Sequence, residues 1–148
     1  MAASKKSKQD KAYYAGPGNK FWKTLHTIGL TTNQLRPIDY KELLTFNIGL
    51  TDICKADYGN DNELDKSKYD VNRLKLCIKE YNPTLVCFNG KNAAKTYLNK
   101  KKIDYGIQKE KIGETKLFVV PSTSGAASGF WDINQWESLV ISLNILKE

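Results

Sequence analysis

The strongest constraint on the fold is a short apolar run that leads directly into a turn and a helical segment. Residues 84–88 form this run, Asn89-Gly90-Lys91 follows at once, and residues 92–98 carry a helical pattern. A continuous apolar run of this length is typical of a strand that is buried on both faces of a parallel sheet. A second such run, residues 116–120, leads into the Ser/Gly-rich loop 121–129. The alternation predicts an α/β fold, a three-layer α/β/α sandwich with a mostly parallel sheet.

Helical spacing of apolar residues recurs outside these two units. Residues 20–28 carry it between a capping Asn19 and a terminating Gly29. The other predicted helices are residues 40–46, 69–80 and 133–146, and the Asp-, Asn- and Lys-rich residues 56–68 predict an exposed loop. With 148 residues, 41% of them hydrophobic, the chain is expected to form a single domain with one packed core.

Charge and cysteine content narrow the functional classes. The net charge of +7 and the pI near 9.2 indicate a basic face of the kind that binds nucleic acid, although many basic proteins bind none. Cys54, Cys77 and Cys87 are odd in number and lack metal-ligand spacing, so we expect reduced cysteines. No apolar run has the length of a membrane span. We therefore expect a cytoplasmic protein without a membrane partner, associated with the nucleoid in a bacterium or nuclear in a eukaryote.

Two loops near the chain ends carry the chemistry of a nucleotide site. Residues 13–22 combine two tyrosines with Gly, Pro and Asn, and residues 120–129 combine Pro with Ser, Thr and Gly. Glycines allow a ligand to approach the backbone, an aromatic ring can stack on a base, and N–H and hydroxyl groups can hold a phosphate. Ligands bind beyond the carboxyl ends of parallel strands, so the turn 89–91 and the loop 121–129 should share one face.

Each of these motifs also has a simpler interpretation. The turn at Asn89-Gly90-Lys91 could be ordinary turn chemistry, Asp52 could cap a helical turn, and the Ser-rich loop could be a flexible connector. His26 is expected on the exposed side of its helix rather than as a catalytic base. The lysine run 100–102 is expected to be a solvated helix end that could touch a phosphate backbone.

Taken in order, the motifs resemble a known family. Residues 14–23 (YAGPGNKFWK), 29–31 (GLT), 48–52 (IGLTD), 88–91 (FNGK) and 121–125 (PSTSG) resemble the motifs of the thymine and mismatch-specific uracil-DNA glycosylases of the uracil-DNA glycosylase superfamily. The resemblance extends over residues 13–129. It implies an enzyme that flips uracil, mismatched thymine or a related damaged base out of double-stranded DNA and hydrolyses its N-glycosidic bond, leaving an abasic site.

The resemblance also implies roles for individual residues. Tyr14 would stack on the flipped base, with Gly16 and Asn19 in the same base-binding loop, while Ser122 and Asp52 would lie near the base and serve catalysis. The residues implied in DNA binding are Asn89, Gly90, Lys91, Ser124, Gly125 and Ala126. No metal or cofactor is expected, because the iron–sulfur branches of the superfamily use four cysteines and this chain has three scattered ones. The protein is expected to be a monomer.

Two departures from the family pattern stand out. The position of the wedge side chain, which fills the gap left by the flipped base, matches Ala126, which is too small for that purpose. Relatives also begin with an apolar strand and a water-positioning loop, and here residues 1–12 match only the end of that loop or form a mobile segment. We expect a start site placed too late or a truncated chain, which would fold poorly or lack activity.

Two other classes remain open on the sequence. A non-catalytic DNA- or nucleotide-binding module could keep the aromatic and the phosphate loops without the water-organising strand. An unrelated α/β nucleotide-binding enzyme is the third interpretation. The formation of abasic sites separates the enzyme from the module.

Overall fold

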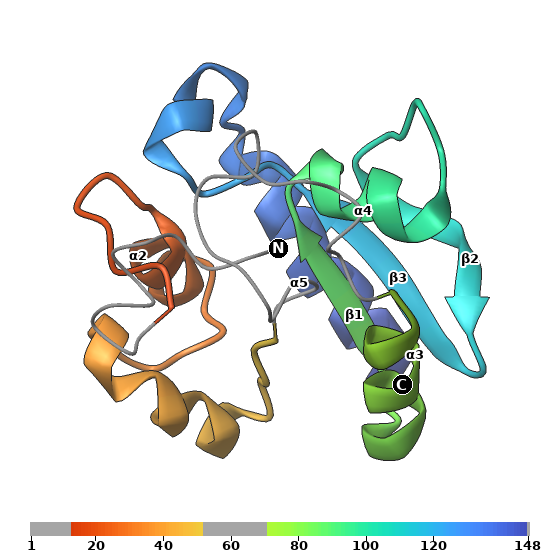
Figure 1. Cartoon of the computed structure of the whole chain (residues 1–148). Coiled ribbons are helices and arrows are strands. Elements are labelled where there is room, and N and C mark those ends of the chain that lie inside the picture. The colour runs from red at the N-terminus through yellow and green to blue at the C-terminus, as the bar shows by residue number, and fades with distance from the viewer. Residues whose placement is uncertain (1–12, 52–70, 148) are drawn as a thin grey trace.

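The computed structural model describes residues 13–51 and 71–147 (Figure 1). The predicted loop 56–68, the N-terminal residues 1–12 and Asp52 lie outside the described residues. None of the helices within the described residues is long and apolar enough to cross a membrane.

A three-stranded sheet forms the centre of the described fold. Its order is β1 (Leu85–Asn89), β3 (Thr115–Val120) and β2 (Gly106–Ile112). β1 and β3 are parallel, with Cys87 opposite Phe118, whereas β2 and β3 form an antiparallel hairpin. The parallel pair consists of the two apolar runs identified in the sequence, so their prediction as buried parallel strands is confirmed. The carboxyl ends of both strands reach the same edge of the sheet.

β3 is buried from both sides, and its side chains alternate between two apolar clusters. Leu117 and Val119 face a cluster that includes Phe88 and residues of two helices. Phe118 and Val120 face the second cluster, which contains Trp22 and Trp136. All four β3 side chains are at most 1% exposed. This two-sided packing confirms the predicted α/β architecture, with helices on both faces of the sheet (Figure 1).

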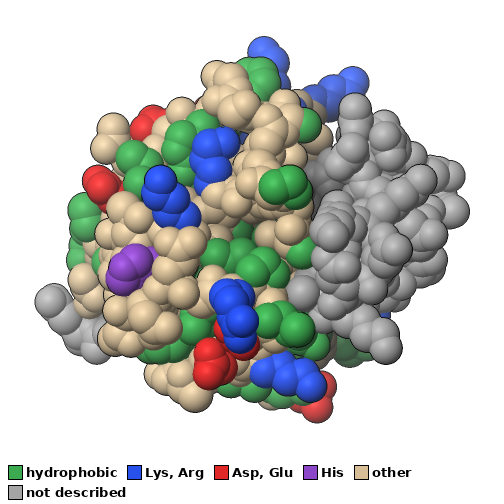
Figure 2. All heavy atoms as spheres, turned by 90° about the vertical axis from the view of Figure 1, so that its left-hand side faces the viewer, with side chains coloured by type: hydrophobic (Ala, Val, Ile, Leu, Met, Phe, Trp, Pro, Cys, Tyr) green, Lys and Arg blue, Asp and Glu red, His purple; other side chains and the backbone are tan. Residues whose placement is uncertain are grey.

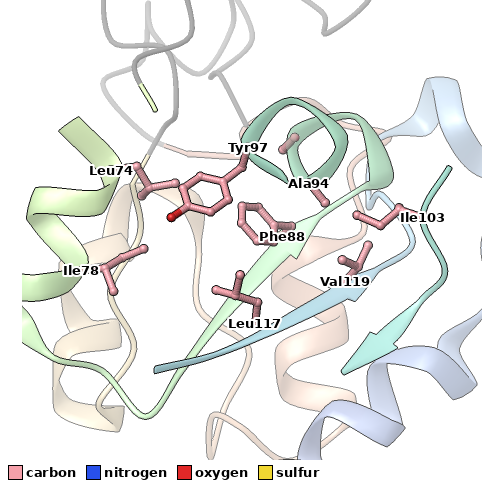
Figure 3. Packing of buried hydrophobic residues seen from close by; sticks show 9 residues of the cluster. Leu74, Ile78, Phe88, Ala94, Tyr97, Ile103, Leu117 and Val119 are labelled. Atoms are coloured by element: carbon pink, nitrogen blue, oxygen red, sulfur yellow. The ribbon is translucent and has the colours of Figure 1, made fainter. Parts of the chain in front are cut away.

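Two helices cover the first face. They are α3 (Val71–Tyr81), which buries Leu74 and Ile78, and α4 (Lys91–Leu98), which buries Ala93, Ala94 and Tyr97. Figure 3 shows these side chains around Phe88, Leu117 and Val119. Both helices were predicted, and α4 begins directly after the turn at Gly90, as the sequence indicates.

The opposite face is covered by α2 (Phe21–Thr27), the 3-10 helix η1 (Pro37–Phe46) and α5 (Ile133–Lys147). Trp22 and Trp136 are 5% and 2% exposed, as core residues should be, and His26 is exposed. η1 begins three residues earlier than expected because Pro37, with its fixed φ, occupies the first helical turn. A second 3-10 helix, η4 (Gly125–Phe130), was not predicted.

β2 was also absent from the prediction. Its half-buried positions include Gln108 and Glu110, whereas Ile107 is 52% exposed, so its sequence lacks the apolar alternation that marks a strand. The Lys100 Nζ lies 2.9 Å from a carboxylate oxygen of Glu110, and Gln108 donates to the backbone carbonyl of Asp104 at 2.8 Å. Polar pairing therefore holds the middle of this strand, whereas Ile112 at its end packs against the first apolar cluster.

Candidate active site

The loop that follows β3 is the meeting point of the predicted motifs. Residues 121–125 contact the turn that follows β1 and the loop that precedes α2. We term this set the loop hub and define it as Gly18, Lys20, Asn89, Gly90 and residues 121–125. The contacts described next show how three segments that are far apart in the sequence are held at one edge of the sheet.

Thr123 is the central residue of the loop hub. It is 0% exposed, and its N–H donates to Asn89 Oδ1 at 3.0 Å while Asn89 Nδ2 donates to Thr123 Oγ1 at 2.9 Å. The Lys20 N–H donates to the Thr123 carbonyl at 2.9 Å. A single buried residue thus links the N-terminal loop to both strand ends. Mutual hydrogen bonding offsets the cost of burying these polar groups.

Two glycine contacts bring the backbones together. Gly90 has φ +109°, and a Cβ at this position would lie 3.2 Å from the Ser122 Cβ. A Cβ on Gly125 would lie 3.3 Å from the Gly18 carbonyl oxygen. Close approach of this kind needs residues without side chains. The glycines at 18, 90 and 125 therefore set the spacing of the three segments.

Ser122 is half-buried at the carboxyl end of β3. Its Oγ accepts a hydrogen bond from the Ser124 N–H at 3.2 Å, and the Ser124 Oγ accepts one from the Ala126 N–H, also at 3.2 Å. The first bond uses a lone pair of the Ser122 oxygen, so the hydroxyl can still donate its hydrogen. Ser122 is thus a hydrogen-bond donor held by a rigid loop.

Tyr14 lies in the N-terminal loop and has the unusual φ of +55°. Its ring centroid is 4.2 Å from that of Phe21, with an interplanar angle of 37°. The preceding residue is anchored as well, because the Trp22 Nε1–H donates to the Tyr13 carbonyl at 3.1 Å. The first turn of α2 therefore contacts both tyrosines. The half-buried ring of Tyr14 is held at the loop by Phe21.

Asn19 connects this loop to α2. Its Oδ1 accepts from the Phe21 N–H at 3.0 Å, and its own N–H donates to the Gly16 carbonyl at 3.0 Å. The first bond satisfies one of the N–H groups that a helix leaves without an intrahelical acceptor. The N-cap position itself is held by Lys20, which makes no side-chain cap bond, so Asn19 bonds the helix start as predicted but from one position before the N-cap.

An open pocket of about 350 Å³ lies beside the N-terminal loop. It is lined by residues 14–17, Asn19, Trp22, Lys23 and residues 34–37. Ser122 does not line it. This volume is within the range of small-molecule sites, but the pocket is on the Arg36 side of the loop and lacks the strand-end groups.

Lys91, at the start of α4, has its ammonium 4.3 Å from the ring centroid of Tyr105. The pKa of the Tyr105 phenol is raised, first by burial and then by the charge of Asp132. The ring therefore stays neutral and offers its electron-rich face to the cation. Lys91 is half-buried, and it directly follows Gly90 of the loop hub in the chain.

Two cysteines of the described part are free thiols. Burial raises the pKa of the Cys87 thiol to about 12, so it stays protonated at neutral pH. Cys54 lies outside the described residues. Within residues 13–51 and 71–147 there is no group of three or more His, Cys, Asp or Glu side chains that could hold a metal ion.

A sequence model of the uracil DNA glycosylase superfamily matches residues 2–139, which is nearly the whole chain. The chain belongs to the uracil DNA glycosylase superfamily. The resemblance seen in the motifs is thus confirmed at the level of the superfamily. Enzymes of this superfamily hydrolyse N-glycosyl bonds in DNA, so membership indicates DNA as the class of substrate.

Most residues that the resemblance assigns to a uracil DNA glycosylase site lie in the loop hub or next to it. Ser122, Ser124 and Gly125 belong to one loop, and Asn89 and Gly90 contact it. The structure gives the Asn89 side chain an interior position, 7% exposed, with both amide atoms bonded to Thr123.

Other assigned residues are placed differently. Ala126 is exposed at the start of η4, and Asp52 lies outside the described residues. Gly16 and Tyr14 lie in the N-terminal loop, which meets the Ser-rich loop at Gly18 and Gly125. Their roles in base binding stay predictions.

Thr123 is the residue that the sequence argument missed. Its burial extends that of β3, because residues 117–121 are all buried and the half-buried Ser122 alone separates them from Thr123. Leu117, Val119, Pro121 and Thr123 are all buried at two-residue spacing, and the Trp136 Nε1–H donates to the Pro121 carbonyl at 3.0 Å. The sequence carries no period that marks Thr123, because both faces of β3 are buried.

Proposed function

We propose that the chain is a DNA repair glycosylase that flips uracil, mismatched thymine or a related damaged base out of duplex DNA and hydrolyses its N-glycosidic bond. Membership of the uracil DNA glycosylase superfamily supports the reaction class. The observation that carries the proposal is the loop hub, in which Thr123 joins the N-terminal loop to both strand ends. This arrangement brings an aromatic loop and a serine donor together at one edge of the sheet.

The chemistry follows from the charge that develops as the bond breaks. Water adds to C1′ of the sugar, the C–N bond breaks, and the base leaves with the bonding electrons as an anion before it gains a proton. A hydrogen-bond donor aimed at a carbonyl of the base stabilises this developing charge. In the proposal Ser122 is that donor and Tyr14 stacks on the base. Asp52 is proposed as a polar catalytic side chain near the base.

DNA binding is proposed to use the segments around the loop hub. Because the Asn89 side chain is bonded to Thr123, it would act by positioning the turn. Gly90, Lys91, Ser124 and Gly125 would meet flanking phosphates, mainly through backbone N–H groups at the start of α4 and in the loop. Lys and Arg side chains are spread among Asp and Glu side chains over the face shown in Figure 2, and the net charge of +7 suits a polyanionic partner.

A preference for mismatched pairs is part of the proposal. Flipping requires unpairing and unstacking, which cost least where the pair is already weak. We therefore expect G·U and G·T pairs to be processed faster than A·U pairs. The chain is proposed to act as a monomer on one duplex, without a metal or cofactor.

The test compares two serine variants of the full chain. Purified wild type, Ser122→Ala and Ser138→Ala are incubated with duplexes that carry G·U, G·T or A·U, and abasic sites are cleaved with alkali. Loss of one donor to a developing anion lowers the rate by about 10²- to 10³-fold, so we expect this loss for Ser122→Ala. Ser138, exposed on α5, should be dispensable.

Binding measured on the same duplexes separates the alternative. Ser122→Ala should bind the G·U duplex with the affinity and salt dependence of wild type. Salt-dependent binding by wild type without abasic sites would contradict the enzyme and favour a non-catalytic DNA-binding module. Equal activity of both serine variants would remove Ser122 from the mechanism.

A further inference from the structure

η4 ends in a large apolar side chain that is almost entirely in solvent. Phe130 is 76% exposed, more than any other large hydrophobic side chain in the described part of the chain. Water contact over a whole phenyl ring is unfavourable, and burial of such a ring against a partner is favourable. Phe130 is therefore an apolar side chain that is available for contact with a partner.

The position of Phe130 relative to the loop hub is fixed at both ends of η4. The helix begins at Gly125, which contacts Gly18, and its N-terminal turn is capped by the Ser124 side chain. After Phe130 the chain is held again, because the Trp131 N–H donates to the Ser128 carbonyl at 3.2 Å. η4 is interrupted at Ala127, whose φ of −104° and ψ of 16° are non-helical, so the chain bends between Gly125 and Phe130.

Trp131, which follows Phe130 in the chain, lies next to a positive charge. The Trp131 ring is half-buried, with its centroid 6.3 Å from that of Trp136, and the Lys20 Nζ lies 5.5 Å from the Trp131 ring centroid. Lys20 also donates to Thr123 in the loop hub. An ammonium group thus lies over the ring of the residue next to Phe130, on a lysine whose backbone N–H is bonded to the hub. Apolar side chains flanked by cations are the groups that DNA-binding proteins insert between bases.

The small residues of η4 make Phe130 the one side chain of this helix with the volume for insertion. The helix reads Gly-Ala-Ala-Ser-Gly-Phe, and it buries no residue. A methyl group at Ala126 cannot replace a base in the stack. We propose that Phe130, and not Ala126, inserts into the base stack beside the flipped nucleotide and holds the opened duplex. This inference rests on the proposed function, because it assigns a wedge for the same base-flipping site.

The experiment measures stack opening separately from catalysis. A G·U duplex carries 2-aminopurine next to the uracil, and its fluorescence rises when the neighbouring stack is broken. Wild type, Phe130→Ala, Phe130→Leu and Tyr81→Ala are compared at saturating protein. Tyr81 is the matched control, because it is an aromatic residue, 74% exposed, at the end of α3, before β1 begins and therefore at the opposite edge of the sheet from the hub. We expect the fluorescence rise with wild type, Phe130→Leu and Tyr81→Ala, and its loss with Phe130→Ala.

Rates of base release give the second readout. Stacking by one aromatic side chain corresponds to a loss of about 10- to 100-fold on removal, so Phe130→Ala should slow release from the G·U duplex by that factor. Release from single-stranded DNA that carries the same uracil should be unchanged, since no partner strand needs to be held open. Equal losses on both substrates would mean damage to the active site and would overturn the wedge assignment.

The outcomes for the two proposals can be told apart. If wild type produces abasic sites and Phe130→Ala matches it in fluorescence and in duplex rate, the wedge is overturned while the glycosylase stands. If wild type produces no abasic sites but opens the stack in a Phe130-dependent way, the wedge stands and the glycosylase falls. Absence of binding to the G·U duplex overturns both.

Discussion

The loop hub and η4 follow one another in the chain, yet they differ in burial and in the way their polar groups are satisfied. Thr123 and Asn89 are buried and bonded to each other, whereas η4 buries no residue and ends in the exposed Phe130. A glycosylase has to hold a reacting base within hydrogen-bond distance and also reshape a long duplex. In the proposed glycosylase, adjacent segments would divide these tasks, the hub by positioning and η4 by contact.

The largest expected effect on stability comes from breaking the buried pair in the hub. Asn89→Leu removes two hydrogen bonds and leaves the Thr123 N–H and hydroxyl unsatisfied in the interior, so the free energy of unfolding should fall by about 2–4 kcal/mol. Urea unfolding measures the loss. The control is Asn92→Leu, at an exposed position of α4, which should stay within about 0.5 kcal/mol of wild type. Similar losses for both variants would refute the positioning task of the hub.

A smaller effect on stability, with a clear effect on activity, is expected at Gly90. With φ +109° and ψ 153°, Gly90 occupies a region that is almost restricted to glycine, so Gly90→Ala should cost about 1–3 kcal/mol. The added Cβ would also press on Ser122 at 3.2 Å. Displacement of a catalytic group by about 1 Å can cost about 10²-fold, so uracil release should slow by one to two orders of magnitude.

Gly113→Ala is the matched control for this variant. Gly113 has a positive φ of +56° in the β2–β3 turn, but nothing lies within 4 Å of a Cβ placed there. We expect a loss of about 1 kcal/mol in thermal unfolding and an unchanged rate of uracil release. A rate that falls equally in both variants would show that backbone strain, and not the contact with Ser122, limits the reaction.

The smallest effect is expected from an exposed polar contact of similar length. Arg36 Nε donates to Asp39 Oδ2 at 2.8 Å, with the Arg36 side chain 78% exposed. The hydrogen bond and charge of Arg36 lower the pKa of Asp39 below its ordinary value of 3.8. The pair therefore stabilises the fold above that pH, and this contribution is lost as the pH falls through the lowered pKa.

Asp39→Asn tests this contribution. The variant should unfold slightly more easily than wild type at neutral pH, and the difference should vanish in strong acid and in high salt. Unfolding midpoints at several pH values measure it. A loss as large as that of Asn89→Leu would show that burial does not distinguish the hub from the exposed surface.

The sequence predicts those elements of the fold in which the burial of apolar side chains decides the residue pattern. β1, β3 and α4 follow from continuous apolar runs and a strand-end turn, because burial on both faces of the sheet allows little else. β2 could not be predicted in this way. Its inward positions are filled by Gln108 and Glu110, whose partners Asp104 and Lys100 are fixed only in the folded chain.

The candidate site likewise contains some residues that the sequence reveals and others that it does not. The motifs around Tyr14, Asn89 and Ser122 are visible in the sequence because their residue types are chemically distinctive. Thr123 is not, since its importance depends on which side of the loop is buried and on a partner 34 residues away. The proposed wedge residue could not be predicted from the sequence either, because Phe130 is distinguished by its exposure in the folded chain and not by its residue type.

The central claim is that the two loops joined by Thr123 form the walls of a base pocket, with Tyr14 on one side and Ser122 on the other. A crystal structure of the full chain with a duplex that carries G opposite 2′-fluoro-2′-deoxyuridine tests it most directly, because the fluorine stabilises the N-glycosidic bond. The account predicts a uracil ring out of the stack, against the Tyr14 ring, with a carbonyl in hydrogen-bond distance of the Ser122 hydroxyl. A uracil that stays stacked in the duplex, or one seated in the pocket beside residues 34–37 away from Ser122, would contradict it.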